Sequence, residues 1–385
     1  MVQSKLPNTS FDLFSSMSKL IEEKGIIDLV YGNTNQPCSK QLLEKVNKHF
    51  TLGFNNYAPV EGVIELRTAI SHRVKEVYGC SYNPDKEITI TGSAMQAYHT
   101  AISALVKDED EVIIFEPHSE FFIPPILLNN GKPVYVQMKA PNFQINWDDV
   151  RKLVTGKTRM IIIESPHNPT GHLMSANDYA QLQKLTAGTN IIILSCEVNQ
   201  SIIFDQNTLS SISQYEKLYD RSLVISSTEA LYNTSNWGLA YCLGTEHIMN
   251  EFRKVHFYQI HHVNTPLQYV MADLLNTDFP IDDISESYGG KRNYFNRLLE
   301  KSNYSVIPAQ GGVYEFIDYS KVSNDPDMVF AEMLALKHGV ATIPASAFYH
   351  EKNKYKFVRI CFSQSNQILE QAAERLLEIA ASRSS

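Results

Sequence analysis

The sequence predicts an α/β protein with a mostly parallel sheet covered on both faces, followed by a smaller α/β unit. Short runs that are apolar at every position, such as Ile161-Ile-Ile163 and Ile191-Ile-Ile-Leu194, alternate with helical patterns. Such runs are typical of parallel strands buried on both sides. The chain has 385 residues, more than one simple core usually holds, which favours one large and one small unit.

The elements follow from periodicity and from stop signals. Apolar residues at helical spacing predict a helix over residues 11–24 that stops at Gly25, and a longer helix over 62–78. Further helices are expected over residues 93–106 and 122–129. Between them we expect short buried strands over residues 88–91, 111–115, 133–137, 159–164, 191–195 and 223–226.

The last third of the chain changes character. Long helices are predicted over about 245–276 and 285–302. Strands at 305–307, 313–317 and 357–362 and a helix at 366–380 follow. We therefore divide the chain into an N-terminal arm with part of the small domain (1–45), a large domain (46–280) and a C-terminal small domain (281–385).

Composition excludes several classes of function. The net charge is -8 without a Lys/Arg-rich run, so neither nucleic acid nor an anionic membrane is an expected partner. The five cysteines contain no CxxC pair, which is typical of reduced thiols. No apolar run has the length of a signal peptide's core or a membrane span. A cytoplasmic protein is expected.

Ser165-Pro-His-Asn-Pro-Thr-Gly171 follows a buried strand, where open α/β sheets bind ligands. Alone it is typical of a turn. It is accompanied by segments 55–67, 91–97 and 226–241, by Gly311-Gly312 and by segment 357–362. In order and spacing this set resembles the class I/II (fold-type I) aminotransferases that depend on pyridoxal 5′-phosphate (PLP), specifically the methionine/kynurenine (glutamine-transaminase-like) branch. The resemblance spans roughly residues 26–377.

The resemblance implies binding roles for several residues. The backbone at Gly92, Ser93 and Ala94 matches the phosphate cradle at a helix start, and Ser227 matches a further phosphate contact. Asn168 matches the residue that bonds the pyridine O3′. The substrate carboxylate would meet Arg359 and the backbone of Gly32, and Tyr57 would reach the phosphate across a homodimer interface.

The reactive centre departs from the family pattern. Ala230 stands where the family has the lysine that holds PLP as a Schiff base, and Cys196 stands where an aspartate pairs with the pyridine nitrogen. Three further positions differ: Asn199 replaces a tyrosine, Ser119 replaces the stacking aromatic, and Gly238 replaces a basic phosphate ligand. His118 or Phe121 would stack only if the loop shifted by one residue. Glu197 is expected to face away from Cys196 because neighbouring strand residues alternate.

These replacements indicate lost chemistry. A positioned general base alone contributes about 10²–10⁴-fold in rate. Because the lysine, aspartate, tyrosine, aromatic and basic residue are replaced together, natural divergence is favoured over an engineered substitution. Lys254 is expected to be a solvated helical lysine. Relatives that carry histidine in place of the lysine keep the aspartate, so they offer no parallel. His118, His167, His261 and His262 lack regular ligand spacing, so no metal is expected.

Three hypotheses remain open. In the first, the protein is a homodimeric family member that has lost transamination and binds a small anion, an amino acid, a 2-oxo acid or a phosphorylated compound, through Arg359 and the phosphate cradle. PLP would bind without a covalent bond or not at all. In the second, it is a working aminotransferase for an aromatic or sulfur-containing amino acid. In the third, it is a lysine-independent enzyme that uses Cys196 and His118.

Overall fold

The computed structural model describes residues 3–6, 9, 11–32, 39–54, 56–232, 234, 237–277, 284–351 and 355–382. Cys38, Asn55, motif positions 233, 235 and 236, and the domain boundary predicted after residue 280 lie outside these residues. The domain boundaries after residues 45 and 280 both stay predictions.

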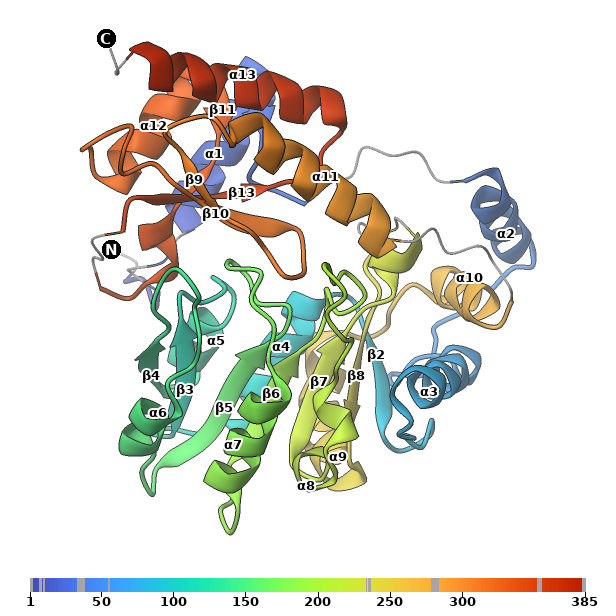
Figure 1. Cartoon of the computed structure of the whole chain (residues 1–385). Helices are drawn as coiled ribbons and strands as arrows, with labels where there is room; N and C mark the ends of the chain where they lie inside the picture. The colour runs from blue at the N-terminus through green and yellow to red at the C-terminus, as the bar shows by residue number, and fades with distance from the viewer. Residues whose placement is uncertain are drawn as a thin grey trace.

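Within the described residues, seven strands form the central sheet, in the order β2-β8-β7-β6-β5-β3-β4 (Figure 1). Only β8 runs against its neighbours, since it pairs antiparallel with both β2 and β7. The predicted mostly parallel sheet is confirmed, although β8 had not been identified. The strands are β2 (Ile88–Thr91), β3 (Glu111–Glu116), β4 (Lys132–Gln137), β5 (Thr158–Glu164), β6 (Ile192–Cys196), β7 (Ser222–Ser226) and β8 (Ala240–Gly244).

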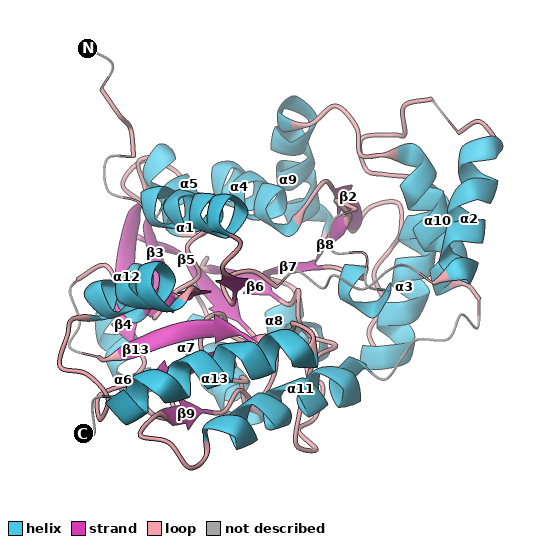
Figure 2. Cartoon of the chain, turned by 90° about the horizontal axis from the view of Figure 1, so that it is seen from above, coloured by secondary structure: helices cyan, strands magenta, loops and turns pink. Residues whose placement is uncertain are grey.

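Helices cover both faces of this sheet, which explains the continuous apolar runs. Met160 and Ile162 of β5 belong to a core with α4 (Ala94–Leu105), α5 (Ile123–Leu128) and α9 (Glu246–Gln259). Ile161 and Ile163 face the opposite core, which includes α3 (Ile64–Tyr78), α6 (Trp147–Leu153) and α7 (Ala176–Thr186). In Figure 2, α4, α5 and α9 lie together along one side of the strands.

A second, four-stranded sheet lies beyond the carboxyl end of the first (Figure 1). Its strands pair antiparallel: β9 (Ser305–Ile307), β10 (Tyr314–Asp318), β12 (Ile343–Pro344) and β13 (Phe357–Cys361). Its helices are α11 (Ile284–Leu299), α12 (Asp327–His338) and α13 (Asn366–Ser382). Near the N-terminus, α1 (Phe11–Lys24) precedes β1 (Ile27–Asp28), which pairs in parallel with β11 (Val340–Ala341). The first residues of the chain thus join its last third.

The single helix predicted over 245–276 is wrong. The chain forms α9 and then α10 (Thr265–Leu275), with Ile260 extended between them. Asn264 caps α10 by accepting from the Leu267 amide at 3.0 Å. Pro266 lies in the first turn of α10, where its missing N–H costs nothing, whereas inside a continuous helix it would break a hydrogen bond. Helices α6, α7, α8 (Glu216–Tyr219) and α12 had not been identified from the sequence, nor had α2 (Lys40–Thr51), which packs against α10.

The remaining helices are short. They are α8 (Glu216–Tyr219) and the 3₁₀ turns η1 (Ile212–Gln214), η2 (Glu229–Tyr232) and η3 (Ala345–Phe348).

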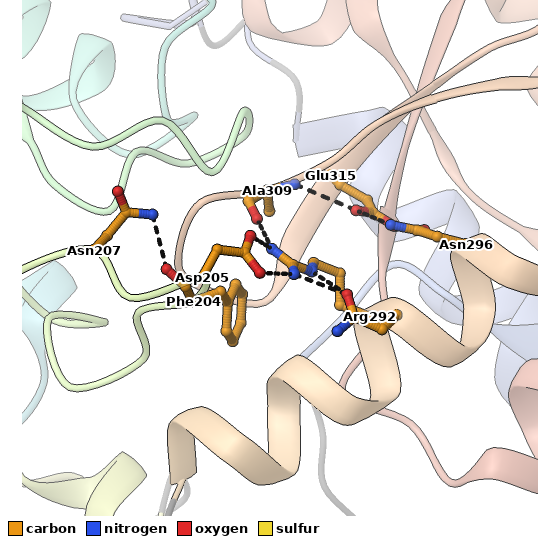
Figure 3. A network of polar contacts seen from close by, with 8 residues as sticks. Phe204, Asp205, Asn207, Arg292, Asn296, Ala309 and Glu315 are labelled. Atoms are coloured by element: carbon orange, nitrogen blue, oxygen red, sulfur yellow. Dashed lines mark hydrogen bonds and ion pairs between the residues drawn. The ribbon is translucent and has the colours of Figure 1, made fainter.

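A buried arginine joins the two sheets. Arg292 on α11 donates to both oxygens of Asp205 at 2.7 Å, and Asp205 lies in the loop after β6 (Figure 3). The same guanidinium donates to the Ala309 carbonyl and lies 4.6 Å from the ring centre of Phe204. Glu315 of β10 accepts from the Ala309 amide at 3.4 Å. Planar, bidentate pairing of this kind fixes orientation as well as distance.

Gly171 makes a second junction between the sheets. Its carbonyl accepts from the amides of Gln310 and Gly311 at 2.9 and 3.1 Å. Its φ is +68°, and a Cβ placed there would lie 2.3 Å from the Ala309 Cβ. Both the backbone conformation and the close approach therefore require glycine.

We expect Gly171→Ala to lower the free energy of unfolding by roughly 2–4 kcal/mol, the sum of left-handed backbone strain and a steric clash. Gly188→Ala is the matched control, since Gly188 has φ +71° and nothing within 4 Å of an added Cβ. That control is expected to cost about 1 kcal/mol. Urea unfolding of both variants measures the difference, and equal losses would contradict the proposed clash.

Candidate functional site

The candidate site lies where the strand order reverses. From β3 the chain goes outward to β4, then returns to β5 on the other side of β3 and continues to β6 and β7. Crevices at such switch points hold ligands in open α/β sheets. Ser119 follows β3 and Asn168 follows β5, and the Asn168 Nδ2 lies 3.5 Å from the Ser119 Oγ. Two predicted site residues therefore meet in this crevice.

Arg359 of β13 reaches the same crevice and is 1% exposed. Its Nη1 donates to the Asn168 Oδ1 at 2.9 Å and its Nη2 to the Val30 carbonyl at 3.1 Å. The rings of Tyr314 and Phe348 lie 4.1 and 4.8 Å from its guanidinium carbon, close enough for cation–π stabilisation. Its Nε has no hydrogen-bond partner. Among the described residues, no carboxylate forms an ion pair with this buried cation.

Gly32 lies beside this cation. A Cβ on Gly32 would be 3.6 Å from the Tyr314 hydroxyl and 3.9 Å from the Cys361 Sγ. The Cys361 thiol lies 3.1 Å from the Ser363 hydroxyl, and the Ser363 carbonyl accepts from the Lys291 Nζ at 2.8 Å. Burial lowers the pKa of Lys291. Sequence reasoning missed this half-buried lysine because it lies in the middle of a helix without a motif around it.

Arg359 and Asn168 line a cavity of about 1310 Å³. Most of its walls are aromatic or aliphatic and come from α1, from the loop after β3 and from the segment around residue 349. Among them are Phe11, Phe14, Tyr31, Phe121, Tyr135 and Tyr349. A mostly apolar cavity with few polar groups is the usual character of a small-molecule site.

The predicted phosphate cradle forms the start of α4. Ser93 caps that helix by accepting from the Gln96 amide at 3.1 Å, and Gly92 donates its amide to the Gln96 Oε1 at 3.2 Å. The amides at the start of α4, including Ala94, point along the helix axis toward any bound anion. Gly238 has φ +71°, and a Cβ there would lie 3.0 Å from the Gly92 carbonyl oxygen. This close approach explains glycine at the position where the family has a basic residue.

Ser227 belongs to the same region. Its Oγ donates to the Leu239 carbonyl at 3.0 Å, and Leu239 directly follows Gly238. Four of the five residues predicted to contact the phosphate therefore lie near the start of α4, although the Gly92 amide already has an acceptor; the fifth is Tyr57.

The end of β5 carries a buried carboxyl group that the sequence analysis missed. Glu164 and Cys196 end adjacent parallel strands in register, and the Cys196 Sγ lies 3.5 Å from the Glu164 Oε1. The thiol also contacts the Tyr98 hydroxyl. Burial raises the pKa of the Cys196 thiol well above its usual value and raises that of Glu164 to about 8. Glu197 bonds the Ser195 hydroxyl at 2.8 Å instead, on the opposite side of the strand.

An acid at the end of an otherwise apolar strand, directly before Ser165, is the signal that would have indicated Glu164.

His118 does not form a reactive pair with Cys196. The His118 ring stacks 6.0 Å from that of Tyr135, and its backbone amide donates to the Phe348 carbonyl at 2.9 Å. Burial lowers the pKa of His118 to about 4, so its ring is neutral. Phe121 lines the cavity and is partly exposed.

Ala230 lies within η2, and its side chain is outside what the structure describes. Asn199 lies in the turn after β6, where its carbonyl accepts from the Ile202 amide at 2.9 Å. Lys254 has a side chain that is 68% exposed and pairs with Glu251 at 2.6 Å, as expected for a solvated helical lysine.

Tyr57, predicted to serve a partner subunit, lies on the surface and is 70% exposed. Its ring packs 4.8 Å from that of His261 and 4.4 Å from that of His262. Phe257 and Tyr258 precede these histidines, and Tyr258 is 87% exposed. We call these five residues the Tyr57 patch.

In the part of the chain that the structure describes, no three His, Cys, Asp or Glu side chains gather as metal ligands would. Likewise, none of the described helices is both long and apolar enough to cross a membrane.

The chain is similar to aminotransferases over almost its whole length. The family model "Aminotransferase class I and II" matches residues 24–376. The methionine aminotransferase of Escherichia coli (strain K12) is 34% identical over 379 residues, covering 98% of both chains. A solved structure of Escherichia coli YbdL, described as having a methionine aminotransferase function, superposes with a TM-score of 0.92 at 34% identity, over 98% of this chain and 99% of that one. N-succinyldiaminopimelate aminotransferase from Mycobacterium tuberculosis superposes with a TM-score of 0.93 at 26% identity, over 99% and 100% of the two chains.

The raised pKa of Glu164 predicts a pH dependence of stability. A carboxyl whose pKa is about 8 in the folded state and 4.5 in the unfolded state takes up a proton on folding at pH values between these two. The contribution of Glu164 to the free energy of unfolding is fully present below pH 4.5 and is lost as the pH rises through about 8. The unfolding free energy of Glu164→Gln relative to the wild type should therefore increase between about pH 5 and pH 8.

Chemical denaturation at a series of pH values measures this difference. Glu315, whose pKa burial also raises to about 8, is present in both proteins, so its contribution cancels. A stability difference that does not change with pH would contradict the burial of an ionisable Glu164.

Proposed function

We propose that this protein binds a small carboxylate ligand at Arg359 and has lost PLP-dependent transamination. The chain belongs to the class I and II aminotransferase family. The observation that carries the proposal is Arg359, a buried cation with an unpaired Nε at the wall of a cavity. A bound carboxylate would give this cation the anionic partner that it lacks among the described residues.

Loss of transamination is supported by the residues around the crevice. Alanine at position 230 offers no amine for a covalent bond to the cofactor. The Cys196 thiol, whose pKa is raised by burial, stays neutral and cannot act as a counter-ion for a pyridinium. Glu164 lies on the neighbouring strand and is itself protonated at neutral pH, because its pKa is about 8.

The chain's residues fit PLP without a covalent bond. Ser93, Ala94 and Ser227 would hold its phosphate, and Asn168 would meet the ring hydroxyl. The cofactor supplies an electron sink for amino-acid chemistry when bound. Here the protein's part is limited to holding the phosphate at a helix start and a carboxylate at Arg359, since no proton-carrying lysine occupies position 230.

The second hypothesis, a working aminotransferase for an aromatic or sulfur-containing amino acid, is favoured by one observation. The 34% identical relative that matches along its full length is named a methionine aminotransferase. Such an activity would need another amine, and half-buried Lys291, whose pKa is lowered by burial, is the first lysine to test. The third hypothesis gains no support from the structure, because Cys196 and His118 contact different residues and neither is poised as a nucleophile or base.

We further propose that the protein is a homodimer through the Tyr57 patch. Three of its residues, Tyr57, Phe257 and Tyr258, have most of their surface exposed, which is unusual for aromatic side chains on a monomer. Tyr57 would then lie close to the partner's crevice, as the family resemblance implies. The expected location, from composition, is the cytoplasm.

Titration of the purified protein with PLP should give a saturable, non-covalent complex or no binding. After borohydride reduction, intact mass should be unchanged, because no lysine stands at position 230. Transamination of L-methionine should not exceed that of free PLP. A reduced adduct of one cofactor mass on a single lysine, Lys291 included, would overturn the proposal. Lys254→Ala and Lys291→Ala serve as matched variants for locating such an adduct.

Multi-angle light scattering tests the dimer. The wild type should have twice the mass of the chain, and Tyr258→Ser combined with Phe257→Ser should shift it toward a monomer by removing buried apolar surface. Phe11→Ser, at another exposed aromatic residue, should leave the dimer intact. A monomeric wild type would also remove the role proposed for Tyr57.

A further inference from the structure

The cavity at Arg359 carries opposite charges on its walls. Glu120 lies in the turn between β3 and α5 and lines the same cavity as Arg359 and Asn168. The other ionisable side chains that line it are His118, His350 and several tyrosines. Burial lowers the pKa of His118 to about 4, which makes it neutral, and His350 is paired with Glu116 at 2.9 Å. Arg359 and Glu120 are left as an unpaired cation and an unpaired acid.

Each of these two groups has an unsatisfied buried atom. The Glu120 Oε2 and the Arg359 Nε both lack a hydrogen-bond partner among the described residues. No ion pair within the described residues joins the two side chains to each other. Leaving a buried charged group incompletely bonded is unfavourable by about 1–3 kcal/mol or more. A ligand that brings an anion to one group and a donor to the other would satisfy both.

Tyr314 lies beside Arg359 and lines the same cavity as both ionisable groups. Its pKa is raised by burial, lowered by the nearby Arg359 guanidinium and raised by the carboxyl groups of Glu120 and Glu164. The Tyr314 ring itself lies 4.1 Å from the Arg359 guanidinium carbon. Arg359, Glu120, Asn168 and Tyr314 thus line one cavity, and the charges of Arg359 and Glu120 act in opposite directions on the pKa of Tyr314.

The remaining walls select the rest of the ligand. They are largely apolar and include Phe11, Phe14, Phe121 and Leu127. A further charged group on the ligand would lose its bound water next to these apolar side chains, and that loss is unfavourable. An apolar group the size of an aromatic or thioether side chain would instead bury its surface there.

We propose that this cavity binds an intact α-amino acid with an apolar side chain, with its carboxylate on Arg359 and its ammonium group on Glu120. The inference rests on the proposed function, which places a carboxylate at Arg359. No bond to the ligand forms or breaks, so the protein recognises the zwitterion itself and needs no cofactor for this step. The amino group that a working aminotransferase would convert is here held by a carboxylate.

Glu164 is the less suitable partner for the ammonium group. It does not line this cavity, and its Oε1 lies next to the Cys196 thiol. Its pKa of about 8 keeps it protonated at neutral pH. Glu164→Gln is therefore the matched control for Glu120→Gln, since both variants convert a half-buried acid of this region to its amide.

Calorimetric titration of the full-length protein with three probes tests the proposal. L-phenylalanine carries both charged groups, 3-phenylpropanoate lacks the ammonium group, and 2-phenylethylamine lacks the carboxylate. Wild-type protein should bind L-phenylalanine about 10- to 100-fold more tightly than either of the others, because each of them leaves one buried charge without its partner. In Glu120→Gln the affinity for L-phenylalanine should fall to that for 3-phenylpropanoate, which should not change. Glu164→Gln should keep the preference of the wild type.

The outcomes separate the two proposals. Equal affinities of the wild type for L-phenylalanine and 3-phenylpropanoate, or a preference that survives Glu120→Gln, would overturn the ammonium site and leave the carboxylate site standing. Failure of both carboxylates to bind would overturn the proposed function as well. The comparison of probes on the wild type requires no variant, so a Glu120→Gln protein that does not fold would not prevent the test.

Discussion

The loop that follows β5 connects the central sheet to the four-stranded sheet at the candidate site. Asn168 in this loop accepts from Arg359 at 2.9 Å, and three residues later the Gly171 carbonyl accepts two amides from the segment at residues 310–311. This short loop thus holds Arg359 in place and also positions the four-stranded sheet against the central sheet. Because Gly171 approaches Ala309 too closely for any Cβ, the geometry of the crevice and the packing between the sheets cannot vary independently.

Two buried arginines illustrate the difference between a structural and a binding charge. Arg292 has a bidentate carboxylate, a backbone carbonyl and an aromatic ring around it, so its charge is fully compensated within the protein. Arg359 has aromatic rings and two neutral acceptors, yet its Nε is unpaired and it has no ion-pair partner among the described residues. Since a buried charge without a counter-ion is unfavourable, the second arginine is the one that a ligand stabilises.

The fold of this family member matches that of its relatives, whereas the family pattern at the reactive positions is one that the sequence is expected to depart from. A fold that superposes with a TM-score of 0.92 on YbdL carries alanine at position 230 and a neutral thiol at Cys196. Gly238 shows how one such change is built into the backbone, because its positive φ and its approach to Gly92 leave no room for a longer residue. A carboxyl group lies on the neighbouring strand at Glu164, where burial raises its pKa to about 8.

The sequence by itself predicted six of the seven strands of the central sheet and the end of the first helix at Gly25. Local periodicity reports burial, and burial on both faces is visible in runs such as 161–163. Periodicity could not reveal the break between α9 and α10, because the helical pattern of apolar residues continues across the extended residue Ile260. It also missed the antiparallel β8, which is short and carries no alternation.

Only the tertiary structure decided which ionisable side chains line the same cavity. Glu120 and Arg359 lie on segments far apart in the chain, and nothing in the neighbouring residues marks Glu120 as a wall of the same cavity. Glu164 and Cys196 likewise become neighbours through strand register. The physical reason is that periodicity encodes how a segment meets its surroundings, whereas the identity of its neighbours depends on the order and register in which strands assemble.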